Sequence, residues 1–215
     1  MSLLFIQYWD VIEGKEDDYA AYINDTYLPA IGTLGFVPVG GYYVEIGFGP
    51  RSIAAYSAES LDEISRIIVG QEFRNLSLKL KRYVTNFSNL VLEPQGTVKT
   101  GKYSVQKSVW KFNQYYDLKP EAKDAYEYFF TTEYLPAMEK INYLKITNCW
   151  NVVLGGFCDI VLEFTFKDPE DIGRLVKNME FQKMTRTLRR TFVTNYSNRV
   201  QKSTRWFREA QWFTG

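Results

Sequence analysis

The sequence predicts an α+β fold in which one small domain occurs twice. Residues 27–30 read Tyr-Leu-Pro-Ala, and residues 134–137 repeat them. The segment 84–89, Val-Thr-Asn-Phe-Ser-Asn, returns at 193–198 as Val-Thr-Asn-Tyr-Ser-Asn. The spacing between copies drifts only from 107 residues (27 to 134) to 109 residues (84 to 193). A period of this length is that of a whole domain, because solenoid modules recur every ~20–50 residues.

Apolar periodicity predicts six elements in the first copy. They are a strand over 3–11, a helix from Gly14 to Ala30, strands over 36–46 and 51–57, a helix from Ser60 towards Leu80, and a strand over 83–92. Pro29 is expected to end or kink the first helix. Ser60 with Glu63 forms a capping-box pattern at the start of the second.

The second copy repeats this order. Its elements are a strand over 109–116, a helix over 120–137, strands over 143–154 and 158–166 around the Gly155-Gly156 turn, a helix from Asp168-Pro169, and a strand over 191–200. We therefore expect repeats at 1–93 and 108–200, a polar linker at 94–107 and an aromatic tail at 201–215. The tail, with Trp206 and Phe213, is expected to pack on the body.

The order strand, helix, strand, strand, helix, strand is the ferredoxin-like module. Neither face of its predicted sheet is polar: Leu3, Phe5 and Trp9 alternate with Leu4, Ile6 and Tyr8. Both faces are therefore expected to be covered, the outer face by helices and the inner face by the other copy. This predicts two βαββαβ repeats packed sheet to sheet as an intramolecular α+β barrel.

In element order, duplication and aromatic strands, residues 3–92 and 109–200 resemble the dimeric α+β barrel superfamily in a tandem-fused form. That superfamily includes antibiotic-biosynthesis-type and haem-degrading monooxygenases, chlorite-dismutase-like proteins and EthD-like proteins. The resemblance rests on architecture, and no family's catalytic motif matches residue by residue. It implies a ligand site between helices and sheet.

Composition excludes several classes of function. The 215 residues carry a net charge of +1 with basic and acidic residues mixed, which argues against a nucleic-acid-binding surface. Basic residues at 79–82 and 186–190 are typical of solvated helix ends. No apolar stretch approaches the ~18 residues of a membrane span, and no signal peptide is visible, so we expect a cytoplasmic protein that contacts no membrane.

Histidine is absent from the chain. Its absence removes the usual general base near neutral pH, Ser-His and Cys-His nucleophiles, and histidine ligands for zinc or haem. Cys149 and Cys158 are expected to be reduced packing residues. We therefore expect no cofactor and no metal ion.

Aromatic residues make up 17% of the chain. They favour a well-packed core, and the alternative is a pocket for a flat or apolar ligand. The ligand-binding candidates are Tyr8, Trp9, Tyr22, Tyr27, Tyr43, Tyr115, Tyr134, Trp150, Asn86 and Asn195. The two asparagines belong to the repeated Thr-Asn-(Phe/Tyr)-Ser-Asn segment. Because both copies keep it, a structural role where the halves meet is favoured over catalysis.

Positions at which the copies differ are the better candidates for a specialised site. Glu163 is expected mid-strand among apolar residues, opposite Tyr56 of the first copy, and Trp150 opposite Tyr43. If buried, Glu163 would have a raised pKa suited to a general base. The alternative is a carboxylate that faces solvent or pairs with Lys145 or Arg199.

Two functions remain open at this point, and so does the question of whether the protein is an enzyme. In the first, it is a cofactor-independent monooxygenase, cyclase or isomerase that acts on a small apolar or aromatic molecule, and Glu163 or an asparagine transfers the proton. In the second, it is a ligand-binding or structural barrel without catalysis. In either case we expect a monomer that is a pseudo-dimer, or a homodimer.

Overall fold

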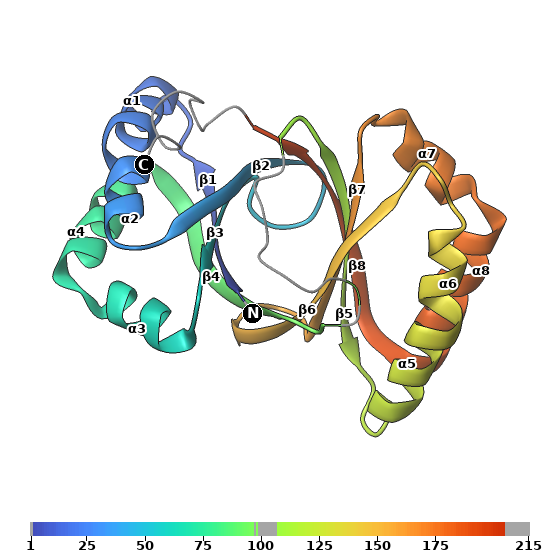
Figure 1. The fold of residues 1–215 in the computed structure, drawn as a ribbon. Helices are drawn as coiled ribbons and strands as arrows, with labels where there is room; N and C mark the ends of the chain where they lie inside the picture. Colours follow the sequence, from blue (N-terminus) through green and yellow to red (C-terminus); the bar gives the residue numbers. More distant parts are fainter. Residues whose placement is uncertain (1, 97, 99–106, 205–215) are drawn as a thin grey trace.

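The computed structural model describes residues 2–96, 98 and 107–204. A β-barrel lies at its centre, and one layer of helices packs on each side (Figure 1). The helices of the first half, residues 2–96, form one layer, and those of the second half, residues 107–204, form the other. The predicted linker lies partly, and the tail almost wholly, outside the described residues.

The elements follow the predicted order in both halves. The strands are β1 Leu3–Val11, β2 Val37–Gly47, β3 Ser52–Ala58, β4 Val84–Pro94, β5 Trp110–Leu118, β6 Lys145–Gly155, β7 Ile160–Phe166 and β8 Val193–Ser203. The α-helices are α1 Glu16–Tyr22, α2 Leu28–Thr33, α3 Leu61–Val69, α4 Gln71–Leu80, α5 Lys123–Phe129, α6 Leu135–Glu139, α7 Glu170–Lys177 and α8 Met179–Thr187. Three π-helical segments are η1 Ile23–Tyr27, η2 Phe130–Tyr134 and η3 Leu188–Phe192.

All eight strands form one antiparallel sheet that closes on itself. The strand order is β1-β3-β2-β8-β5-β7-β6-β4, with β4 hydrogen-bonded back to β1. The halves join at two seams, β2 with β8 and β4 with β6. The predicted α+β barrel is therefore confirmed in its coarse form. Closure leaves no unpaired sheet edge, which removes the usual route to edge-to-edge aggregation.

Three separate hydrophobic clusters hold the barrel and its helices together. One fills the space between the first-half helices and the barrel, around Trp9, Tyr27 and Phe36. A second fills the matching space in the second half, around Phe112 and Tyr134. The third lies inside the barrel and includes Tyr8, Tyr115 and Trp150. Both sheet faces are thus covered, as the strand pattern predicts.

The helices differ from the prediction in two places. Pro29 does not end its helix but lies in the first turn of α2, where its missing N–H costs nothing, and η1 precedes it. The second helix is divided at Gly70, whose extended backbone separates α3 from α4. Ser60 caps α3 as predicted, accepting a hydrogen bond from the Glu63 N–H at 3.1 Å.

The third π-helical segment, η3, has no counterpart after α4. Phe73 and Phe181 lie 108 residues apart (73 to 181), whereas Val84 and Val193 lie 109 apart (84 to 193). The second half therefore has one extra residue between α8 and β8, and η3 accommodates it. Single-turn π-bulges of this kind are frequent at functional sites.

Buried phenol and thiol groups predict that the fold is lost in alkaline solution. Burial raises the pKa of Tyr196 and of Cys149 to about 12, and raises the pKa values of Tyr27 and Tyr134 further. A raised pKa in the folded state favours the protonated form. Its contribution to stability is complete below the unfolded pKa, near 9 for Cys and 10 for Tyr, and is lost as pH rises towards 12.

We expect the urea midpoint to fall as pH increases above about 9. A urea midpoint that stays constant between pH ~9 and pH ~12 would contradict this.

Candidate functional site

The structure disperses the residues singled out from the sequence. The barrel interior holds Tyr8, Tyr115, Trp150 and Glu163. The first helix–sheet core holds Trp9, Tyr22 and Tyr27, and the second holds Tyr134. Exposed on the surface are Tyr43 and both asparagines, Asn86 and Asn195. They do not converge on one site. Cys149 and Cys158 are free, as expected.

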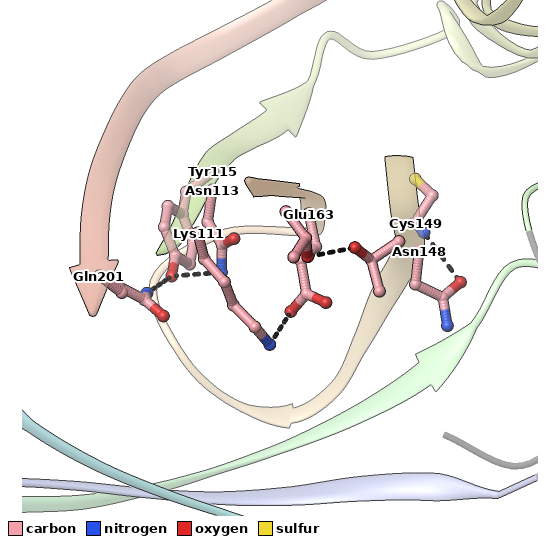
Figure 2. A network of polar contacts seen from close by, with 9 residues as sticks. Lys111, Asn113, Tyr115, Asn148, Cys149, Glu163 and Gln201 are labelled. Carbon is pink, nitrogen blue, oxygen red and sulfur yellow. Dashed lines mark hydrogen bonds and ion pairs between the residues drawn. The ribbon is translucent and has the colours of Figure 1, made fainter. Parts of the chain in front are cut away.

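Glu163 lies inside the barrel and forms an ion pair. Its Oε2 accepts a hydrogen bond from Lys111 Nζ at 2.7 Å, and both side chains are buried (Figure 2). The expected alternative partners, Lys145 and Arg199, are wrong, because Lys111 on the neighbouring strand β5 points into the same interior. Burial lowers the pKa of Lys111, but the Glu163 carboxylate and Tyr42 outweigh that and raise it above its ordinary value. A carboxylate held by an ammonium group is not a free general base.

The strand registers correct the predicted correspondence between the halves by one residue. Ile6 of β1 lies opposite Ala55, and Asn113 of β5 lies opposite Glu163. Glu163 therefore corresponds to Ala55, and Phe164 corresponds to Tyr56. By the same registers Trp150 corresponds to Tyr42. A one-residue shift moves a side chain to the other face of a strand, so this correction decides what faces the interior.

With the correct registers, one pattern governs the barrel interior. Five interior positions carry an apolar residue in the first half and a polar residue in the second. Each first-half residue is given with its second-half counterpart: Leu4 with Lys111, Ile6 with Asn113, Ala55 with Glu163, Leu90 with Arg199, and Leu92 with Gln201. All five polar side chains are buried. The first half shows that the barrel folds with hydrocarbon at these positions, so the polar set is not required by the architecture.

The polar interior has little free space. Its cavity, lined by Lys111, Asn113, Tyr115 and Glu163 among others, has a volume of about 20 Å³. That is room for one water molecule and not for an organic substrate. Tyr115 accepts a hydrogen bond from Gln201 Nε2 at 2.9 Å, which fixes both groups.

Two tyrosines from the repeated Tyr-Leu-Pro-Ala segment make matched structural contacts. The Tyr27 hydroxyl donates to Gln7 Oε1 at 2.9 Å, and the Tyr134 hydroxyl donates to Gln114 Oε1 at 3.0 Å. Each bond ties a π-helical segment to the first strand of the same half. A buried glutamine needs such a partner.

The repeated asparagines also make matched contacts, within each half rather than where the halves meet. Asn86 and Asn195 adopt φ values of 52° and 50°, and their amides donate to Asp10 at 2.8 Å and Asp117 at 2.6 Å. Asparagine tolerates this left-handed backbone better than other side chains do. The contacts lie at the strand bulges and are structural.

Replacing Asn195 with alanine is expected to lower the free energy of unfolding by about 1–2 kcal/mol, since it loses the hydrogen bond and strains the left-handed backbone. Asn195→Gly is expected to cost less, because glycine adopts positive φ freely. Urea unfolding of both variants, with Asn86→Ala as the matched case, measures this. Equal losses for alanine and glycine would contradict it.

A groove of about 1430 Å³ lies in the second half. It runs between α7, α8 and η3 on one side and strands β5 and β8 on the other, and reaches the end of β2. Its apolar and aromatic lining consists of Ile46, Trp110, Phe112, Pro169, Ile172, Gly173, Val176, Phe181, Tyr196 and Val200. This is a helix–sheet cleft of the kind that the resemblance implies.

The rim of the groove is positively charged. Its lining includes four basic residues, Lys177, Arg186, Arg189 and Arg190, and one acidic residue, Glu45. Among the described residues none of the four cations has an ion-pair partner. Arg189 lies over the Tyr196 ring, with its guanidinium carbon 4.9 Å from the ring centroid. The cluster expected to be a solvated helix end therefore borders an apolar hollow.

The corresponding region of the first half is filled by a ring. Phe36, just before β2, is buried and stacks on Phe5 with ring centroids 4.7 Å apart. Its edge faces Phe73 at 6.4 Å. Leu144, just before β6, is the corresponding residue of the second half. Phe5 and Phe73 correspond to the groove residues Phe112 and Phe181, and Leu144 packs against their cluster with a smaller side chain than Phe36.

Two searches of the geometry find nothing within the described residues. No three His, Cys, Asp or Glu side chains there gather in a way that would hold a metal ion. In the same part of the chain, no helix has the length and apolar character needed to cross a membrane.

Comparison with solved structures identifies the fold. An anthrone oxidase-like protein superimposes with a TM-score of 0.67 and 8% identity, over 94% of this chain and 91% of that one. A candidate monooxygenase from Lactobacillus acidophilus gives 0.62 and 12%, over 94% and 93%. A chlorite dismutase variant from Candidatus Nitrospira defluvii gives 0.65 and 10%, over 94% and 91%. The chain therefore shares with these proteins the fold of a closed α+β barrel with a layer of helices on each side.

Sequence comparison adds no narrower assignment. No protein-family model matches the chain, and no curated protein matches it in sequence. At these identities the structural likeness carries the fold alone.

Proposed function

We propose that the protein binds a small molecule with a flat apolar or aromatic body and an acidic group in the groove between α7, α8 and β5, β8. The observation that carries this proposal is the groove itself, about 1430 Å³ with an aromatic lining and four cations that have no ion-pair partner within the described part of the chain. An apolar cavity with a few polar groups is the usual form of a small-molecule site. Arginine is suited to carboxylate or phosphate because its planar donors match their oxygens.

We further propose that the protein acts on this ligand without a resident cofactor, in one of two ways. The first is a monooxygenation with dioxygen as the oxidant, in which a CH₂ group becomes C=O with one oxygen atom of O₂ while the other oxygen atom and the two hydrogens leave as water. The second is a redox-neutral cyclisation. The solved structures of this fold include an anthrone oxidase-like protein and candidate monooxygenases, which supports the proposal at the level of fold. Tyr196 and Asn198 line the groove and are the groups placed to handle a proton. Glu163 does not line it. A non-catalytic binding protein is the alternative.

The remaining parts of the account are also proposals. The two halves are ferredoxin-like modules, residues 1–93 and 108–200, that arose by duplication and are joined by a linker at 94–107. The chain would then act as a pseudo-dimer in the cytoplasm. The matched asparagine and tyrosine hydrogen bonds, which occur in both halves, support the duplication.

The test is a titration of the ¹⁵N-labelled protein with planar aromatic carboxylic acids and their methyl esters. We expect the acids to shift amide resonances of α7, α8 and η3 in a saturable manner, and the esters to bind at least tenfold more weakly. Because loss of one charge-assisted hydrogen bond costs about 1.5–3 kcal/mol, a tenfold loss is the minimum expected. Saturable shifts confined to the first half, or acids no better than esters, would contradict the proposal.

A further inference from the structure

Arg199 on β8 is a buried cation. It is 1% exposed, and its Nε and Nη1 have no hydrogen-bond partner among the described residues. Within the described residues no carboxylate lies within ion-pair distance of it. The nearby Asp117 and Asp159 accept hydrogen bonds from Asn195 and from backbone N–H groups instead. Buried charges in proteins are normally paired, because removing an ion from water is costly.

Four aromatic rings surround the guanidinium. Its central carbon lies 4.1 Å from the ring centroid of Phe48, 4.9 Å from Phe157, 5.0 Å from Tyr115 and 5.2 Å from Tyr8. Ring faces stabilise a positive charge and offset part of its desolvation. Arg199 also makes a side-chain hydrogen bond with Tyr8, but its Nε and Nη1 are left without an acceptor.

The fold does not need an arginine at this position. Arg199 lies opposite Asn113, as Leu90 lies opposite Ile6 in the first half. Leu90 is fully buried and packs in the interior cluster. Leucine therefore satisfies the same place in the barrel without the cost of a buried charge. A costly group retained where the fold accepts hydrocarbon indicates a role beyond packing.

The guanidinium lies at one mouth of the barrel, beneath the tips of two hairpins. The β2–β3 turn covers it so closely that a Cβ on Gly49 would lie 2.6 Å from its Nη2. The β6–β7 turn supplies Phe157, which is 43% exposed. Gly47, Gly49, Gly155 and Gly156 all have positive φ in these turns.

We propose that Arg199 is the binding group of a second site, at this barrel mouth, for a small planar monovalent oxyanion such as formate or nitrate. The single positive charge of Arg199 would be balanced by one negative charge on the ligand. The interior ion pair of Lys111 and Glu163 contributes no net charge. A planar anion matches the donors at the edge of the guanidinium plane. Entry requires displacement of Phe157 from the guanidinium.

The site is separate from the groove. Asn198 and Val200 line the groove, while Arg199 between them faces the barrel interior. Successive strand residues point to opposite faces. The two sites therefore lie on opposite sides of β8, and either can fail without the other.

Thermal unfolding of the full chain at constant ionic strength tests the proposal, with sodium formate or nitrate replacing sodium gluconate, an anion too large to enter. We expect the wild-type Tm to rise by roughly 3–5 °C for each tenfold increase of the small anion above its Kd. Arg199→Leu, which installs the first-half residue, is expected to abolish this dependence and to raise the Tm in gluconate. Arg174→Leu, an exposed arginine paired with Asp171, is the control and should keep the dependence.

A second readout reports on the guanidinium directly. The Arg199 ¹⁵Nε–¹H resonance, assigned by its loss in Arg199→Lys, should shift with formate and not with gluconate. Equal anion dependence of the Tm in wild type and Arg199→Leu would overturn the proposal. So would an Arg199 Nε resonance that formate does not move.

Discussion

Replacing Glu163 with alanine is expected to lower the free energy of unfolding by about 3–5 kcal/mol, because it leaves the Lys111 ammonium buried and unpaired. Both members of the pair are nearly inaccessible to water, and their charged atoms lie 2.7 Å apart. Lys111→Leu alone is expected to cost a similar amount, since it strands the carboxylate.

The first half supplies the matched control. The double variant Lys111→Leu with Glu163→Ala reproduces Leu4 and Ala55, the residues at the corresponding positions. It is expected to recover most of the loss, because no charge is left unpaired and buried ion pairs seldom exceed hydrocarbon in net stability. Urea unfolding of the four proteins gives the coupling energy of the pair. Additive losses in the double variant would show that the two residues act independently and would contradict this account.

The second large effect concerns the groove. Gly173 on α7 lines it, and a Cβ built there meets no atom within 4 Å. Gly173→Trp should therefore fill the groove without moving the backbone, and the helix should gain stability because glycine is its poorest ordinary residue. We expect the affinity for aromatic acids to fall more than tenfold, a loss of at least ~1.4 kcal/mol, in a protein that unfolds no earlier than wild type.

Ser65 on α3 provides the control for this substitution. It is exposed and follows the buried Ile64 as Gly173 follows the buried Ile172. Ser65→Trp adds the same ring to the same place in the other half and is expected to leave binding unchanged. The titration of both variants with one acid decides between the halves. Equal loss in both, or loss only in Ser65→Trp, would contradict the assignment of the groove.

Most of the fold is predictable from the sequence because it depends on patterns that occur twice. Apolar runs and turns give the order of elements, the Ser60 cap is confirmed, and apolar residues on both strand faces predict a covered sheet. Pro29 is misleading, because a proline in the first turn of α2 needs no N–H donor. The divided helices follow from Gly70 and from the π-helical segments, which leave little trace in apolar periodicity.

The candidate site is less predictable, for two physical reasons. Strand registers depend on bulges, and without them Glu163 is matched with Tyr56 instead of Ala55. The groove depends on an empty volume, which no residue type announces. Two signals in the sequence did point to it: the single extra residue before Val193, and the basic residues at 186–190. Interpreted as a helix end alone, that cluster gives no reason to expect an apolar hollow beside it.

The central claim is that the second half alone carries the ligand site. The most direct measurement is a high-resolution crystal structure of the protein soaked with the aromatic acid that binds best in solution. The account predicts electron density for the acid between α8 and β5, with its acidic group within hydrogen-bonding distance of Arg186, Arg189 or Arg190. Density beside Phe36 in the first half, or a groove left empty by an acid that binds in solution, would contradict it.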